Sequence, residues 1–314
     1  MTTAAQTVGV AVLTHNNENT MFYGNKALQQ AVEAATDGDV ISLSPGTFEG
    51  YIGGPYNDTY FTKSGLTIIG SGMDEGPSQT IVKDFQTRAD LNSDKYLKLT
   101  LKNLYSEYIS TFGDGKYDLS LEKCKSKSSI NCDVDNDNSS TLEMSNCVAL
   151  MENSSFINFN VNAYNCVLKV AELGKEVTTN KVFTNCITLI NPIGNGSFNN
   201  SVFLYGQGSL SSSIRATNCK AIGSNSNFFG IQAFGNESLG SDFEAFVEGS
   251  FYELKPELTS TWVDENGEQI GIYGGPEPFS ALPDAPRFTK FNVPTRTDAD
   301  GKLPVKIEIT MPEK

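Results

Sequence analysis

Short apolar runs recur along the middle of the chain, and each begins just after a polar residue followed by a cysteine. The pairs are Lys123-Cys124, Asn146-Cys147, Asn165-Cys166, Asn185-Cys186 and Asn218-Cys219. Successive cysteines are 23, 19, 20 and 33 residues apart, and Asn200-Ser201 divides the longest interval into 15 and 18. A repeat of about 20 residues is typical of stacked-coil proteins, because each coil buries its apolar side against the next. The spacing therefore predicts a β-solenoid.

The polar residue of each pair is expected at a turn between strands, and the cysteine after it is expected to point into the core. Asparagine suits such a turn because it tolerates the left-handed backbone conformation. Stacked coils place equivalent Cβ atoms about 4.8 Å apart, beyond the roughly 3.5–4.5 Å that a disulfide prefers. We therefore expect a ladder of buried thiols, with Cys124 and Cys132 as the pair best suited to a disulfide. One cysteine per coil offers no paired chelate for a metal.

The N-terminal region predicts a strand, a turn and one helix. Val8 to Leu13 alternates as an entry strand, and His15 to Thr20 reads as a polar turn. Asn25 to Ala35 has a single apolar face formed by Ala27, Leu28, Ala31, Val32 and Ala35. The end of a solenoid exposes apolar side chains and unpaired backbone groups, so we expect this helix to cover the first coil.

The C-terminal region differs in composition from the coils. A proline-rich link leads to two alternating stretches, Phe288 to Val293 and Leu303 to Met311, with Asp300-Gly301 near the turn between them. These stretches predict a hairpin that covers the C-terminal end or packs along the side, and a small oligomerisation element is the alternative. The expected division is an entry strand and capping helix in 1–36, a parallel β-helix in 37–275, and a link with a hairpin in 276–314.

Composition and charge narrow the range of partners. Only 19% of the 314 residues are charged and the formal net charge is −14. A nucleic-acid backbone or an anionic membrane would repel such a surface, so neither is an expected partner. No stretch is long and apolar enough to predict a membrane span. Residues 1–14 do not read as a secretory signal, so either a leader has been replaced or the protein leaves the cell by another route.

Two segments carry a resemblance to a known family. ALQQAVEAATDGDVISLSPGTFEGYI, followed by LTIIGSG and TIV, resembles the N-terminal cap and first coils of the pectin-lyase-like right-handed parallel β-helices. DENGEQIGIYGGPEPF, followed by TDADGKLPVKIEIT, resembles the ending of β-helix proteins from gut Bacteroidetes. With the Asn-Cys coils between them, the resemblance covers nearly the whole chain. It implies an all-β, single-stranded right-handed parallel β-helix with an N-terminal capping helix and a C-terminal β-hairpin, and it says much less about activity.

The enzymes of that family bring charged groups together on one outer face, and their hallmark motifs do not occur here. Pectate-lyase-like sites use Arg or Lys beside Ca²⁺-binding Asp, whereas Arg215 is the one arginine of the central coils. Polygalacturonase-like sites use an Asp-Asp pair and a His-Gly, and neither is found. The single histidine, His15, falls in the N-terminal turn. These observations favour a protein without catalytic activity.

Two segments are candidates for ligand binding. Tyr51, Tyr56 and Tyr60 lie in a loop rich in Gly, Pro and Asn between early strands, and their rings are suited to stacking on sugars. The alternative is that some of these rings pack back onto the solenoid. Asp133, Asp135 and Asp137 alternate in a polar turn and could gather Ca²⁺, the one cofactor that the sequence suggests. The alternative is a solvated acidic turn, because the segment does not match an EF-hand loop.

The leading hypothesis is a non-catalytic extracellular or surface β-helix that binds glycan or serves as an adhesive or structural module. Its expected partner is a polysaccharide or a cell-surface glycan, and the oligomeric state is left open. One alternative is a polysaccharide lyase or hydrolase whose catalytic residues converge only in space. The other is a phage fibre or tail component, which would place the protein in a virion. Fold analogy alone does not separate these hypotheses.

Overall fold

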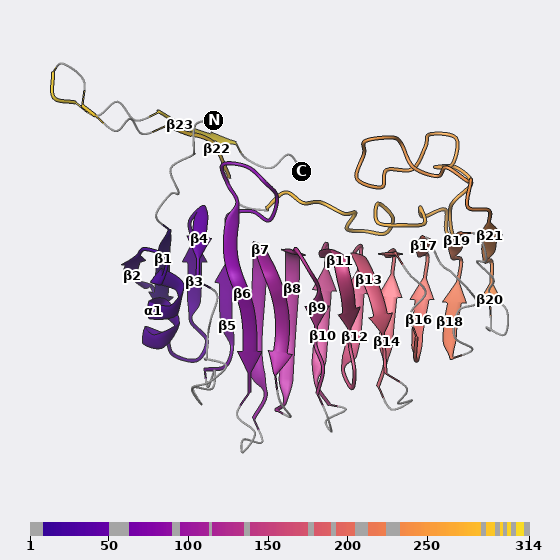
Figure 1. The fold of residues 1–314 in the computed structure, drawn as a ribbon, viewed down its shortest axis with the longest axis horizontal. Coiled ribbons are helices and arrows are strands. Elements are labelled where there is room, and N and C mark those ends of the chain that lie inside the picture. The colour runs from indigo at the N-terminus through magenta and orange to yellow at the C-terminus, as the bar shows by residue number, and fades with distance from the viewer. Residues whose placement is uncertain are drawn as a thin grey trace.

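The computed structural model of the chain is a rod built from one sheet of 21 strands, with a separate two-stranded hairpin (Figure 1). The structure describes residues 9–49, 63–89, 95–112, 115–134, 139–174, 179–189, 193–204, 213–223, 233–283, 287–292, 296–297, 300–302 and 306–310. Apart from the first strand, which pairs antiparallel with both of its neighbours, the strands of this sheet pair in parallel with the strands of the preceding and following coils. The predicted all-β solenoid is therefore confirmed.

Three faces run along the rod, and each is formed by one ladder of stacked strands. The first, ladder A, contains β3 (Val40–Leu43), β5 (Leu66–Ile69), β7 (Leu97–Phe112), β8 (Tyr117–Ser126), β10 (Thr141–Ser145), β12 (Asn160–Tyr164), β14 (Lys181–Thr184), β16 (Gly196–Asn199), β18 (Ile214–Thr217) and β20 (Ala233–Phe234). Side chains along these strands alternate between the core and the outer face, as the burial of β8 and β10 shows.

The second ladder, ladder B, passes through the later part of β7 and of β8. It contains β4 (Gly46–Phe48), β6 (Thr80–Arg88), β7, β8, β11 (Val148–Ser155), β13 (Val167–Glu172), β15 (Ile187–Thr188), β17 (Val202–Leu204), β19 (Lys220–Ile222) and β21 (Glu237–Leu239). A shorter third ladder joins the ends of β6 and β7 to β9 (Ile130–Asn131) and then to the ends of β11 and β13.

A single residue in the left-handed conformation joins ladder A to ladder B in most coils. Its φ lies between 50° and 54° in Asn103, Lys123, Asn146, Asn165, Asn185, Asn200 and Asn218. This confirms the turn predicted for the Asn-Cys pairs, because asparagine accepts a positive φ at little cost.

The cysteines that follow these turns form the predicted stack of thiols. All six cysteines of the chain are buried and unlinked, so the disulfide considered between Cys124 and Cys132 is not formed. The Cys147 backbone N–H lies 3.4 Å from the sulfur of Cys166 in the next coil. In the coil after Cys186 a serine takes this place, and the Cys186 N–H donates to Ser201 Oγ at 3.1 Å. Leu104 holds the same position in the coil before Cys124, so small side chains line this corner of the core from Cys124 to Cys219.

One lysine occupies a core position in ladder A. Lys181 lies opposite the inward-facing Val161 of the preceding coil and is 2% exposed. Its ammonium group donates to Thr179 Oγ1, and no carboxylate of the described residues forms an ion pair with it. Gly196 lies next to Lys181 in the following coil, where a Cβ atom would meet the Leu173 side chain.

The N-terminal end of the rod is covered by the expected helix together with a hairpin. Helix α1 (Ala27–Ala34) buries Ala27, Leu28, Ala31 and Val32 against the first coil. Strand β1 (Val10–His15) pairs with β3 on one side and with β2 (Glu18–Tyr23) on the other. The prediction of a polar turn over residues 15–20 was wrong, because Asn16 and Asn17, with φ of 49° and 66°, make a two-residue turn that starts a second strand at Glu18.

After β21 the chain folds back over ladder B. Residues 241–263, the C-terminal lobe, bury Trp262, whose indole stacks on Phe243 at 5.9 Å. Residues 264–283, the strap, then run back along the turn asparagines, as the orange trace beside the rod shows (Figure 1). The lobe and the strap cover the outward-facing side chains of Val167, Ile187 and Val202. Trp262 thus anchors the C-terminal segment.

The strap is held by hydrogen bonds from the turn residues. Asn165 Nδ2 donates to the carbonyl oxygens of Ile272 and Gly274, each at 2.8 Å. Asn146 Oδ1 accepts from the Ser280 N–H at 2.9 Å, and Lys123 Nζ donates to the Leu282 carbonyl at 2.9 Å.

The predicted C-terminal hairpin is formed by β22 (Arg287–Asn292) and β23 (Lys306–Thr310). It lies beyond the end of the strap, beside the N-terminal half of the rod (Figure 1). The last coil, β20 and β21, is at the opposite end of the rod, so the hairpin does not cover the C-terminal end.

Candidate ligand-binding face

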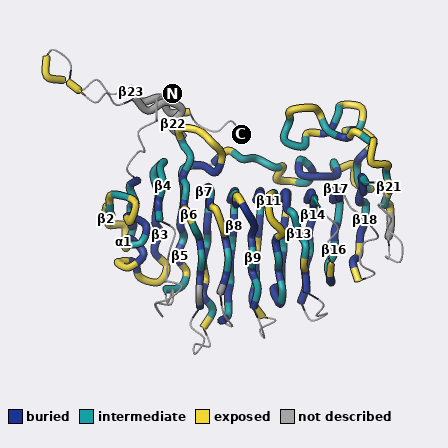
Figure 2. The backbone as a smooth tube through the Cα atoms, in the orientation of Figure 1, coloured by how far each residue is buried: buried dark blue, intermediate teal, exposed yellow. Residues whose placement is uncertain are grey.

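The outer face of ladder A is the part of the rod surface best suited to binding an extended ligand. The lobe and the strap cover ladder B in the C-terminal half of the rod, and they lie on the other side of the turn asparagines. Figure 2 shows that the ladder A strands carry teal and yellow segments along the length of the rod, so their outward side chains reach the surface. Each coil presents two or three such side chains.

A row of neutral polar groups crosses the middle of this face. Register places Ser145, Tyr164, Thr184 and Asn199 side by side on four successive coils. At about 4.8 Å per coil, the row spans about 14 Å parallel to the rod axis. A second row, displaced by two residues, contains Glu143, Asn162, Val182 and Ser197. Hydroxyl and amide groups therefore surround Tyr164 on both sides.

Tyr164 is the exposed aromatic side chain of this region. Its side chain is 48% exposed, although it lies in the middle of a strand. A ring on a flat sheet offers one face to a ligand and carries a hydroxyl at its edge. We call Tyr164 together with Ser145, Asn162, Thr184 and Asn199 the polar face. Sequence reasoning missed Tyr164, although alternation with Val161 and Ala163, the buried residues of the same strand, places it outward.

The charged groups nearer the N-terminus on ladder A are paired with one another. Lys98 Nζ lies 3.1 Å from Asp118 Oδ2, and Thr141 Oγ1 donates to the other oxygen of Asp118 at 2.8 Å. Lys102 and Glu122 form a second ion pair in the next row. These pairs satisfy the carboxylates locally, and the polar face beyond them remains mostly uncharged.

The predicted tyrosines and aspartates are placed only in part. Tyr51, Tyr56 and Tyr60 lie outside the described residues, as do Asp135 and Asp137. Asp133 is described, and its Oδ1 accepts from Ser155 Oγ and from the Ile157 N–H, both at 2.9 Å. This carboxylate therefore links two coils. Among the described residues, no three His, Cys, Asp or Glu side chains are grouped in a way that could hold a metal ion.

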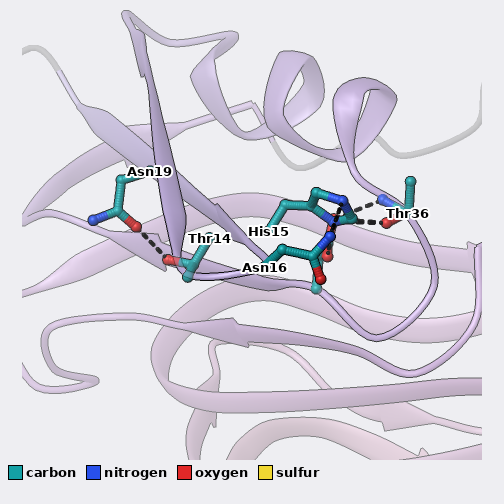
Figure 3. A network of polar contacts seen from close by, with 6 residues as sticks. Thr14, His15, Asn16, Asn19 and Thr36 are labelled. Carbon is teal, nitrogen blue, oxygen red and sulfur yellow. Dashed lines mark hydrogen bonds and ion pairs between the residues drawn. The ribbon is translucent and has the colours of Figure 1, made fainter.

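The single histidine belongs to the N-terminal cap. His15 Nδ1 lies 2.8 Å from Asp39 Oδ1, and Asn16 Nδ2 lies 2.9 Å from His15 Nε2 (Figure 3). The Asp39 side chain is only 7% exposed and also accepts from the Thr36 N–H at 2.7 Å. Burial alone would raise the pKa of Asp39, but the hydrogen bonds from Thr36 and His15 lower it overall. The network ties the β1–β2 turn to the segment after α1.

A comparison with protein families, curated proteins and solved structures found no match for the chain. None of the helices in the described residues has the length and apolar character of a membrane span.

Proposed function

We propose that this protein is a non-catalytic β-solenoid that binds neutral glycan chains on its polar face, at an extracellular or cell-surface location. The proposal rests above all on Tyr164, an exposed ring in the centre of a flat row of hydroxyl and amide groups. Sugar rings stack their apolar faces on aromatic side chains and bond their hydroxyls to neighbouring polar groups.

The repeat of the solenoid supports an extended ligand rather than a compact one. Successive coils offer the same kinds of group at about 4.8 Å intervals. A linear polysaccharide lying along the rod axis would meet Ser145, Tyr164, Thr184 and Asn199 in turn. Such a surface also fits an adhesive or structural role.

The charge of the site supports a neutral ligand. The protein carries a formal net charge of −14, and the polar face itself has no cationic side chain between coils β10 and β16. A polymer of uronates would be repelled by the protein as a whole and would find no neutralising group around Tyr164. Neutral polysaccharides avoid both costs.

A glycan array that spans neutral and acidic polysaccharides tests the proposal. We expect binding to neutral glycans that Tyr164→Ala weakens about 5- to 10-fold, since aromatic contacts contribute about 1 kcal/mol. Tyr108→Ala is the matched control, because Tyr108 is an exposed tyrosine on the third ladder. Equal loss in both variants would contradict the assignment of the face. New reducing ends or unsaturated uronates in the same mixtures would instead identify a hydrolase or a lyase.

A further inference from the structure

The strand β2 forms the edge of the sheet at the N-terminal end of the rod. Strand β1 is paired on both sides, with β2 and with β3. Among the described residues, β2 pairs with β1 alone, and Figure 1 shows it at the end of the rod beside α1. Its first four residues, Glu18 to Met21, are all exposed. The outer edge of β2 is therefore open to solvent in this part of the structure.

The hairpin geometry determines which backbone groups point to that edge. The Gly24 N–H donates to the Gly9 carbonyl at 2.9 Å, so these two residues form a hydrogen-bonded pair across the hairpin. Such pairs alternate along an antiparallel ladder. The backbone groups of Glu18, Thr20 and Phe22 therefore face β1. Those of Asn19, Met21 and Tyr23 point outward.

Two exposed apolar side chains accompany these outward backbone groups. Met21 is 57% exposed and Tyr23 is 65% exposed, whereas Phe22 between them packs toward the core. The strand contains no lysine and no proline, and its pairing with β1 is regular, so it has no bulge. Soluble proteins commonly use lysine, proline or a bulge to prevent an edge strand from pairing with another chain. This edge lacks them.

The sequence of β2 is suited to pairing with itself in the antiparallel direction. Outward-pointing residues must meet outward-pointing residues, and a register centred on Met21 matches all of them. Met21 then lies opposite the partner's Met21, and Asn19 lies opposite the partner's Tyr23. The twofold symmetry repeats the second pair, which makes three pairs in all. Each pair forms two backbone hydrogen bonds, six in total, and a shift of two residues in either direction would lose one pair. Glu18, the one charged residue of the strand, faces the partner's Gly24 rather than a second carboxylate.

We propose that a second copy of this chain docks here, with the two β2 edges paired about a twofold axis at Met21. The axis is perpendicular to the sheet, so the sheet continues from one rod into the other and the outer faces of both ladder A sheets point the same way. If the polar face binds glycan as proposed above, the dimer presents two such faces. With seven strand spacings from β2 to β12, the two Tyr164 rings would be about 70 Å apart.

Molecular mass measured against concentration tests the dimer. By light scattering or sedimentation, the mass should rise from 34.0 kDa toward twice that value as the full chain is concentrated from about 1 µM to about 1 mM. Met21→Pro removes an outward N–H without disturbing the hydrogen bonds to β1, and it should raise the dissociation constant of the dimer at least 10-fold. Met21→Val keeps the N–H and should dimerise as the wild type does. A wild-type chain that stays monomeric throughout this range, or one unaffected by the proline, overturns the proposal.

Cysteine cross-linking tests the register independently of affinity. Paired residues in a hydrogen-bonded position have Cα atoms about 5.5 Å apart, within the range of a disulfide. Met21→Cys should therefore form a disulfide-linked dimer on mild oxidation. In Tyr23→Cys the two new thiols would be four residues out of register, about 13 Å apart, and should not cross-link. The native cysteines are all buried and leave the readout clear. Efficient cross-linking of Tyr23→Cys with none for Met21→Cys would refute this interface.

Discussion

Lys181 allows the cost of a charge inside the solenoid to be measured. Burial lowers the pKa of this lysine from 10.5 to about 8. The difference of about 2.5 pKa units corresponds to about 3 kcal/mol, which the folded protein loses at neutral pH by keeping the ammonium group charged in the core. Lys181→Met keeps most of the side-chain volume and removes the charge. It also leaves the Thr179 hydroxyl without its hydrogen-bond donor, which lowers the free energy of unfolding by about 1 kcal/mol. We therefore expect the variant to be more stable by about 2 kcal/mol at pH 7.

The same reasoning fixes the sign of the pH dependence. Between about pH 8 and pH 10.5 the unfolded chain holds a proton on this lysine that the folded chain has released. The wild type therefore gains stability relative to Lys181→Met as the pH rises through this window. Urea unfolding followed by circular dichroism at pH 7 and at pH 10 measures both quantities. The advantage of the variant should be largest at pH 7 and should shrink by pH 10.

Lys83→Met is the matched control, because Lys83 is an exposed lysine on β6 and its removal changes the net charge equally. It should alter the free energy of unfolding by less than about 0.5 kcal/mol at either pH. The reasoning would be refuted if Lys181→Met were less stable than the wild type at pH 7. A stability difference that does not change with pH would refute it as well.

Three further predictions concern the thiols, the strap and the cap. Burial raises the pKa of five of the six thiols, so each of these thiols should lower the free energy of unfolding by about 1.4 kcal/mol per pH unit above its unfolded pKa of about 8.5. Urea unfolding at alkaline pH in a Lys181→Met background measures this loss, and a free energy that does not change with pH would contradict the buried stack. Asn165→Gly keeps the left-handed turn but removes two hydrogen bonds to the strap, so the free energy of unfolding should fall by about 1–3 kcal/mol. Limited proteolysis should then cleave near Ile272 sooner, and unchanged proteolysis would show that the strap does not depend on these bonds. The pKa of Asp39 is lowered in the folded protein, so its carboxylate stabilises the cap above its unfolded pKa of about 3.9. Asp39→Asn should therefore have a lower free energy of unfolding than the wild type at pH 7, and this difference should close as the pH falls below about 4. A difference that persists at low pH would point to a cause other than charge.

The coils could be predicted from the sequence because their chemistry repeats. The turn between ladders A and B needs a positive φ, which favours asparagine at every one of these turns except Lys123. The adjoining core corner holds cysteine or serine at every one of them except Leu104. These residues recur in most coils and so leave a periodic signal. The capping helix left a signal of its own in the spacing of its apolar residues.

Other features left no periodic signal. Strand β2 begins with three polar residues and does not alternate, and it forms because the Asn16–Asn17 turn places it beside β1. The strap is bound through backbone carbonyl and N–H groups, which most sequences possess. Tyr164 was predictable from the alternation of its strand, but its value became visible only when register placed it beside polar groups from other coils. Long-range pairing, rather than local preference, decides these cases.

The most direct test of the proposed function is a crystal structure of the protein with an oligosaccharide cut from the best neutral glycan on the array. The account predicts sugar rings over Tyr164, with their hydroxyls bonded to Ser145, Asn162, Thr184 or Asn199 along the rod axis. A ligand bound on another face, or a cleaved product in its place, would contradict it.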